Sequence, residues 1–223
     1  MYTTNKFVIV FCLMFFSFGV FAKKFQGYII NNHMDTIHGE IRLHKWSFTT
    51  GYFIIKGYEL ETLHILVEFR EHNRGEYKSY DAEKLFGFGV KYKGKELTYR
   101  STDVDYKSII KGEQQRTRFL QILYDGQLIL YKDVVHVENP LAKSKGDLYK
   151  TYNIYYLGKC KSQDIKRMEI NNQIVSVRDL LLKLNIESEF INSISENITL
   201  KNFTKVLEDY DVWKLSKSKV HGV

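Results

Sequence analysis

The chain has 223 residues, of which 44% are hydrophobic and 26% are charged, and its formal net charge is +7 at pH 7. A chain of this length is expected to bury one main hydrophobic core. Its two cysteines are Cys12 and Cys160. Because Cys12 lies in a segment that we expect to be removed, an internal disulfide is excluded and apolar burial must hold the core together.

Residues 1–22 have the pattern of a secretory signal peptide. Lys6 precedes an apolar run at 7–21, and Ala22 follows it. The run is shorter than the roughly 20 residues that a membrane-spanning helix needs. We therefore predict cleavage after Ala22, export to the periplasm, the outer membrane or the medium, and no transmembrane span after cleavage. Export disfavours nucleic acid as a partner, and the remaining mildly basic chain suits anionic surfaces such as lipid headgroups.

Two segments at the start of the mature chain alternate between apolar and polar residues. Residues 25–31 and 36–43 flank a polar turn and predict a first hairpin, with Ile41 and Leu43 on its apolar face. Residues 63–70 alternate in the same way and predict a strand with His64 on the polar face. We also expect a possible short strand at 52–55 and a helical turn at 79–85.

The central stretch, residues 85–137, predicts an antiparallel meander. Phe86, Phe88 and Val90 recur at every second position, so that they share one face of a strand. The Asp125-Gly126 pair lies between two apolar runs and predicts a tight hairpin turn with positive φ angles. An exposed loop around Pro140 and a further strand at 151–157 are expected to follow.

From residue 176 the apolar spacing changes from two residues to three and four, which predicts helices. Ser176 and Asp179 have the spacing of a capping box. Three apolar stripes follow: Val177, Leu180, Leu181 and Leu184; Phe190, Ile191, Ile194 and Ile198; and Leu200, Phe203, Val206, Leu207 and Tyr210. Short amphipathic helices bury little by themselves, so we expect these three to pack on each other and on the sheet.

The predicted fold is α+β and mainly β. It consists of an antiparallel meander sheet, either a partly closed barrel or a sandwich, followed by a small C-terminal segment of three helices. We divide the chain into a signal peptide at 1–22, a β domain at 23–172, a helical segment packed on the sheet at 173–215, and a disordered tail at 216–223.

The sequence contains no nucleophile elbow, no phosphate-binding glycine loop and no paired-cysteine metal site. His33, Asp35 and His38 crowd the first turn, but their spacing does not define a metal site, and we predict neither a metal nor a cofactor.

Three acidic residues, Asp103, Asp105 and Glu113, could form the carboxyl pair of a glycan hydrolase. Basic residues surround them, which favours a charge-balanced loop instead. We therefore lean against an enzyme.

Tyrosines on predicted strands are the candidate binding residues, namely Tyr92, Tyr99, Tyr124 and Tyr131. Exposed aromatic rings on a sheet can bind sugar rings or a protein strand, because they offer rigid apolar area with a polar tip. The alternative is that tyrosine simply favours strands.

Several segments carry a resemblance that covers nearly the whole mature chain. They are the signal peptide, GYIINNHMDTIHGEI at 27–41, YDAEKLFGFGV at 80–90, RFLQILYDGQLILYK at 118–132, YYL at 155–157 and VLEDY at 206–210. Together they resemble a set of exported β-rich proteins of the Bacteroidetes type with no assigned activity. The resemblance implies a Gram-negative envelope setting and a β-rich body with a helical end.

From these observations we expect an exported protein of the cell envelope that acts by binding or as a structural or interaction protein. Its partner would be a glycan, an anionic lipid headgroup or another envelope protein. The alternative is an envelope glycan hydrolase that uses Asp103, Asp105 or Glu113.

Overall fold

The computed structural model describes residues 23–43, 60–72, 75–108, 112–138, 149–160, 165–168, 170–171, 174–195 and 197–220. The expected signal peptide, the possible strand at 52–55 and the loop around Pro140 lie outside these residues. No helix in the described part of the chain is both long and apolar enough to span a bilayer.

Ten strands form one antiparallel sheet in the order β10-β9-β8-β7-β6-β5-β1-β2-β3-β4. They are β1 (Lys23–Asn31), β2 (Thr36–Leu43), β3 (Leu66–Glu71), β4 (Lys78–Asp81), β5 (Leu85–Tyr92), β6 (Lys95–Ser108), β7 (Gly112–Asp125), β8 (Leu128–Glu138), β9 (Tyr149–Lys159) and β10 (Ile165–Arg167). The predicted mainly β fold with its antiparallel meander is confirmed. The sheet does not close into a barrel.

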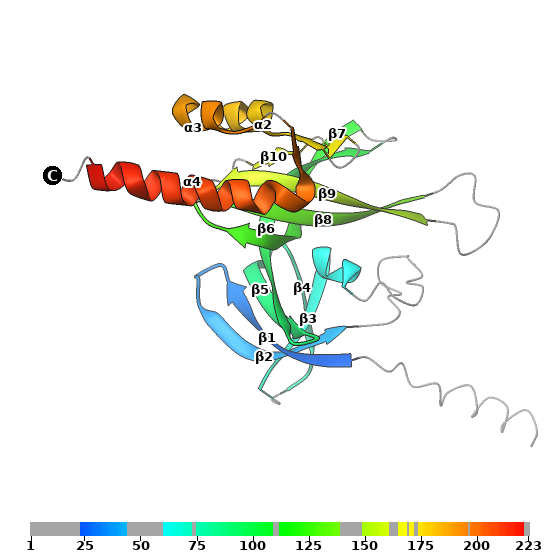
Figure 1. The fold of residues 1–223 in the computed structure, drawn as a ribbon. Helices are drawn as coiled ribbons and strands as arrows, with labels where there is room; N and C mark the ends of the chain where they lie inside the picture. The colour runs from blue at the N-terminus through cyan, green and yellow to red at the C-terminus, as the bar shows by residue number, and fades with distance from the viewer. Residues whose placement is uncertain are drawn as a thin grey trace, which may run out of the picture.

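The N-terminal half of the sheet is strongly curled. β4 and β5 are four strand spacings apart in the sheet, about 19 Å if it were flat. Only residues 82–84 connect them, and four backbone steps span at most about 14 Å. The strands β1–β5 must therefore curl around their own apolar side, and Figure 1 shows them gathered at one end of the molecule. The enclosed core includes Ile41, Phe88 and Val90, each fully buried.

β8 and the later part of β9 are covered on both faces. Leu128 and Leu130 pack with the C-terminal helices, whereas Ile129 and Tyr131 pack with residues of β6, β7 and β9 on the other side. An almost continuous apolar run is what such a doubly covered strand requires. These two strands thus form the layer on which the helices rest, as Figure 1 shows.

The C-terminal region holds three helices and a small sheet. They are α2 (Val177–Lys183), α3 (Ser188–Ser193) and α4 (Leu200–Val220), with β11 (Ile170–Asn171), β12 (Ile174–Ser176) and β13 (Asn197–Thr199). The three predicted stripes supply the core against β8 and β9, although Ile198 lies on β13. Residues 216–220, predicted as part of a disordered tail, continue α4 as helix. The hydroxyls of Ser216 and Ser218 each donate to the carbonyl three residues earlier.

α4 is tied to the hairpin between β7 and β8. The Asp211 carboxylate accepts hydrogen bonds from the Tyr124 hydroxyl (2.6 Å) and from the Gln127 backbone N–H (2.9 Å). A Cβ atom at Gly126 would overlap this carboxylate. The turn lies where the Asp125-Gly126 pair predicts it, but the expected positive φ is wrong, because Gly126 lies outside the left-handed region. Glycine is needed here for the close approach of Asp211.

Consecutive positive φ angles occur instead at Lys93 (48°) and Gly94 (78°), between β5 and β6. This is the pattern of a type I′ turn, which suits the twist of a two-residue hairpin.

The predicted capping box at the start of α2 is also modified. The Ser176 hydroxyl donates to the Asp179 carboxylate at 3.1 Å and not to a backbone N–H.

Two N-terminal predictions are wrong in detail. The expected helical turn at 79–85 is strand β4 followed by a turn. The expected strand at 63–70 begins only at Leu66, after the 3-10 helix η1 (Glu61–His64). Leu63 and His64 are both 1% exposed. Two consecutive buried side chains do not suit a strand with one solvated face, and the helical turn lets both point inward.

Candidate functional site

The central strands separate at one point, which we call the fork. The β6–β7 ladder continues to the pair Ser108 and Gly112, and the β8–β9 ladder continues to Glu138 and Tyr149. The β7–β8 ladder, however, begins only at Gln121 and Lys132. Beyond this pair, backbone groups of β7 and β8 that face the fork need other partners, because buried N–H and C=O groups are rarely left unpaired.

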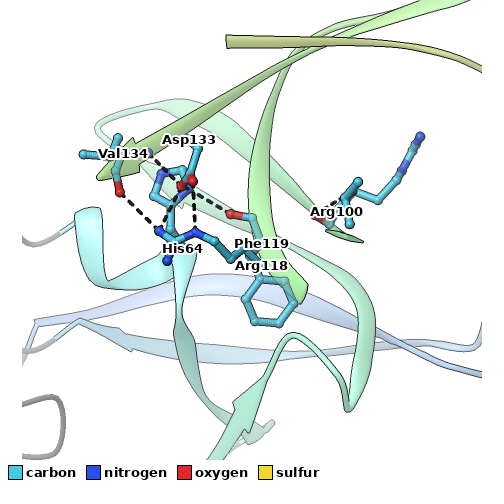
Figure 2. A network of polar contacts seen from close by, with 7 residues as sticks. His64, Arg100, Arg118, Phe119, Asp133 and Val134 are labelled. Carbon is cyan, nitrogen blue, oxygen red and sulfur yellow. Dashed lines mark hydrogen bonds and ion pairs between the residues drawn. The ribbon is translucent and has the colours of Figure 1, made fainter. Parts of the chain in front are cut away.

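Three side chains at the fork form a buried polar network, shown in Figure 2 and called here the His64 network: His64, Arg118 and Asp133. Arg118 binds both oxygens of the Asp133 carboxylate: its Nε donates to Oδ2 at 2.9 Å, and its Nη2 donates to Oδ1 at 2.9 Å. Arg118 Nη2 also donates to the Val134 carbonyl at 3.2 Å, and the Val134 N–H donates to Asp133 Oδ1 at 2.8 Å. The network therefore satisfies backbone groups of β8.

His64 connects η1 to both strands of the fork. Its Nδ1 lies 2.8 Å from the Phe119 carbonyl oxygen and 3.2 Å from Asp133 Oδ1. Because both oxygens can only accept, Nδ1 must carry the proton. The Tyr99 ring packs edge-on against the imidazole at 5.5 Å between centroids. At the fork, η1 is thus linked to β7 and β8 through a polar side chain, and Phe88 of β5 adds an apolar contact with Phe119 of β7 at 4.9 Å between ring centroids.

The His64 network keeps Asp133 ionised. Burial by itself raises the pKa of this carboxyl, but the hydrogen bond with His64 and the charge of Arg118 outweigh it and hold the pKa below its usual value. A His–Asp pair also occurs in catalytic triads, where the histidine exchanges a proton with a substrate. Here His64 and Asp133 are each 1% exposed. A general base must reach the proton that it removes, so this network serves the fold.

No local pattern in the sequence predicts the His64 network, and the alternation of residues 63–70 predicted His64 on a solvated face. Its members come from η1, β7 and β8, so that no local spacing connects them. One signal was available: Asp133 follows the apolar run of residues 128–131 in a strand buried on both faces. A buried carboxylate needs a cationic or hydrogen-bonding partner from elsewhere in the fold.

A second polar cluster lies on the outer side of the curled half, and we call it the β2 face. It consists of Tyr28 from β1, His38, Glu40 and Arg42 from β2, Glu68 and Arg70 from β3, and Tyr77 just before β4. Cross-strand ion pairs join Arg42 to Glu68 at 2.6 Å and Arg70 to Glu40 at 2.5 Å. The β2 face is therefore balanced in charge.

Aromatic rings are held in place on the β2 face. The Tyr77 ring lies beside two guanidinium groups, with Cζ of Arg42 at 4.4 Å and Cζ of Arg70 at 4.8 Å from its centroid. Its hydroxyl donates to Glu40 at 3.0 Å. The hydrogen bonds from Arg70 and then from Tyr77 lower the pKa of the Glu40 carboxyl. The Glu40 carboxylate is therefore ionised at neutral pH and held by two donors.

Tyr28 extends the same face toward β5. Its ring lies 5.8 Å from the ring of the exposed His38 and packs over Gly89, where a Cβ atom would overlap it. Both tyrosines of the β2 face are half-buried, with their remaining surface directed to solvent. This arrangement presents aromatic carbon next to paired arginines and glutamates, and the exposed Lys24 of β1 lies beside Glu40.

The four tyrosines that the sequence suggested do not form one platform. Tyr99 and Tyr131 are only 2% and 3% exposed, in different apolar clusters. Tyr99 stacks on Phe88 at 4.6 Å between centroids. Tyr92 packs beside Phe25, and Tyr124 is hydrogen-bonded to Asp211 of α4. Two of the rings therefore lack the exposed faces that the prediction needed.

The suggested carboxylates lie on the ribbon formed by β6 and β7. Asp103 is exposed and accepts a hydrogen bond from the Thr117 hydroxyl at 2.7 Å. The backbone register pairs Asp105 with Gln115 and Lys107 with Glu113. The side chains of Asp105 and Glu113 lie outside the described part. No group of three or more metal-ligating side chains occurs among the residues that the structure describes.

The chain was compared with protein-family models, with curated proteins and with solved structures, and none of the three comparisons gave a match.

Proposed function

We propose that the protein is a non-enzymatic, exported protein of the cell envelope that binds a glycan through the β2 face. The signal-peptide pattern of residues 1–22 supports export. The observation that carries the binding proposal is the half-buried Tyr77 ring held beside Arg42 and Arg70 on a solvent-facing side of the sheet.

The chemistry of this face suits a sugar better than a charged ligand. A pyranose ring offers C–H groups that pack on aromatic carbon and hydroxyls that both donate and accept hydrogen bonds. The paired guanidinium and carboxylate groups provide donors and acceptors next to the rings. An anionic lipid surface would need an excess of positive charge, which the ion pairs of the β2 face remove.

The non-enzymatic part of the proposal is supported by how the acidic groups are used. Asp133 is buried and bound by Arg118 and His64, while Glu40 and Glu68 are paired with arginines. These carboxylates hold strands together in the described part of the chain. Glycoside hydrolysis instead needs one carboxyl that gives up a proton and a second that faces the sugar.

A sedimentation assay with insoluble envelope glycan tests the binding. We expect the wild-type chain to co-sediment and Tyr77→Ala to bind at least about tenfold more weakly, since about 1.4 kcal/mol of contact energy corresponds to this factor. Tyr152→Ala is the matched control, because Tyr152 is a 50% exposed tyrosine on β9. Equal binding of the two variants, or no binding by the wild type, would contradict the proposal.

The same insoluble glycan also tests the alternative function, an envelope glycan hydrolase. Release of soluble sugar by the wild type, abolished in Asp103→Asn, would favour the glycan hydrolase instead. Export is tested by cell fractionation and N-terminal sequencing, which should place the mature N-terminus at Lys23. An uncleaved chain in the cytosol would remove the envelope setting.

A further inference from the structure

α4 has an outward side that no other described element covers. Its inward side is formed by Phe203, Val206, Leu207 and Tyr210, all buried against α2, α3, β8 and β9. Positions three or four residues apart share one side of a helix, and this spacing identifies the residues on the opposite side of α4. They are Lys201, Lys205, Glu208, Val212, Leu215 and Lys219. We call these six positions the α4 stripe.

The middle of the α4 stripe is apolar and exposed. Val212 is 67% exposed and Leu215 is 61% exposed, the highest values among the large hydrophobic side chains of the described residues. Residues 215–218 are all exposed, and Figure 1 shows this end of α4 reaching past the sheet and the other helices. A second molecule can therefore approach this side without meeting the body of the protein.

We propose that the α4 stripe pairs in an antiparallel manner with the α4 stripe of a second copy of this chain. The twofold axis passes between positions 213 and 214. Val212 of each copy then meets Leu215 of the other, and Glu208 of each copy lies opposite position 219, a lysine, of the other. Each contact occurs twice, as a closed twofold interface requires. This inference does not depend on the proposed glycan binding.

The charges on the α4 stripe select this register. If Val212 packed on Val212 of the second copy, Lys205 of each chain would lie opposite Lys219 of the other, and like charges would meet. In the proposed register the ion pairs flank the apolar centre, as they do in paired helices that choose their partners by charge. A lipid surface fits less well, because the exposed Glu208 would face anionic headgroups.

The expected dimer is weak and reversible. A contact along one helix buries less than the roughly 1,200 Å² that stable interfaces reach. Sedimentation equilibrium of the purified full chain from about 1 µM to about 1 mM covers the range in which such a contact dissociates. We expect a concentration-dependent equilibrium between monomer and dimer for the wild type.

Charge reversal gives the decisive comparison. Glu208→Lys and Lys219→Glu should each weaken the dimer at least tenfold, because like charges then face each other twice. The double variant Glu208→Lys/Lys219→Glu should restore it. Asp209→Lys is the matched control, because it makes the same change in charge at an exposed position next to the α4 stripe. Far-ultraviolet circular dichroism should be unchanged in all four variants.

Three results would overturn the proposal. The first is a wild-type chain that stays monomeric throughout the concentration range. The second is a double variant that dimerises no more tightly than the single variants, or an Asp209→Lys variant that dimerises as weakly as Glu208→Lys. The third is a monomer that binds vesicles of phosphatidylglycerol and phosphatidylcholine and loses this binding in Val212→Asp, since a lipid surface would then be the partner of the α4 stripe.

Discussion

The two halves of the molecule close their cores by different means. Among the described residues of the curled half, β1–β5, no strand ladder joins the edge at β4 to β7 or β8, and the His64 network is the polar link at the fork. The helical end packs on β8 and β9 through a large apolar cluster, with polar contacts such as that of Asp211 at its rim. Both closures have an apolar core, but the closure at the fork also contains a few mutually dependent charged groups, whereas the helical end depends mainly on many small apolar contacts.

This difference has an energetic consequence. Buried charged groups that bind one another contribute only when all of them are present, since removing one leaves the others unpaired in a medium of low polarity. Apolar contacts respond in proportion to the volume removed. The curled half should therefore fail abruptly when one group is lost, whereas the helical end should weaken by degrees.

The largest effect is expected from Asp133→Ala. Without this carboxylate, Arg118 and the Nδ1 proton of His64 lose a buried partner, which costs about 3–5 kcal/mol of unfolding free energy. Urea denaturation followed by fluorescence measures the change. Asp103→Ala is the control, because this exposed carboxylate accepts one described hydrogen bond and its loss should cost about 1 kcal/mol or less. Similar losses in both variants would refute the special role of the His64 network.

The helical end should respond to Leu181→Ala with a loss of about 3 kcal/mol, the middle of the range for truncating a fully buried leucine. Leu181→Met keeps most of the volume, and it should cost less than about 1.5 kcal/mol. The ratio of the two losses in urea denaturation tests whether this end weakens by degrees. An equal loss in both variants would count against that view.

Acid should weaken the fork. The pKa of Asp133 is held below its usual value in the folded protein, so its stabilisation is complete above the pKa of the unfolded chain, which is near 4. This stabilisation is lost as the pH falls through the lower pKa that Asp133 has in the folded protein. The unfolding free energy should therefore decrease between pH 5 and the acid limit. Asp103→Asn should keep this slope, and Asp133→Asn should flatten it.

The smallest effect is expected at the rim of the helical end. Tyr124→Phe removes the hydroxyl that donates to Asp211 but leaves the Gln127 N–H bound to the same carboxylate. A hydrogen bond to a charged group contributes about 1.5 kcal/mol at the lower end of its range, and we expect a loss of this size. Tyr152→Phe, at an exposed tyrosine, should change stability by less than about 0.5 kcal/mol in the same assay. A larger loss at Tyr152 would show that the rim contact is not what holds α4.

Local patterns predicted the elements whose causes are local. The alternation of Phe86, Phe88 and Val90 predicted β5, and the stripe containing Phe203 and Leu207 predicted α4, because burial of one face imposes a period of two or of about 3.6. The pattern could not say where α4 ends. The side-chain bonds of Ser216 and Ser218 to the preceding turn lie within a polar segment that carries no apolar period.

The candidate sites were less predictable. Tyrosine alternates on strands whether its ring faces solvent or core, so the sequence could not tell that Tyr99 and Tyr131 are buried. The β2 face combines residues from three strands and the segment before β4, and the position of Tyr77 between two arginines depends on the order β1-β2-β3-β4.

By itself, the sequence determined an antiparallel, mainly β chain with a helical end, because these features follow from the spacing of apolar residues along the chain. Only the tertiary structure decided how the N-terminal strands curl, where β7 and β8 separate, and which charged groups become buried there. The physical reason is distance along the chain: His64 and Asp133 meet across 69 positions, and only the packed sheet brings them within 3.2 Å.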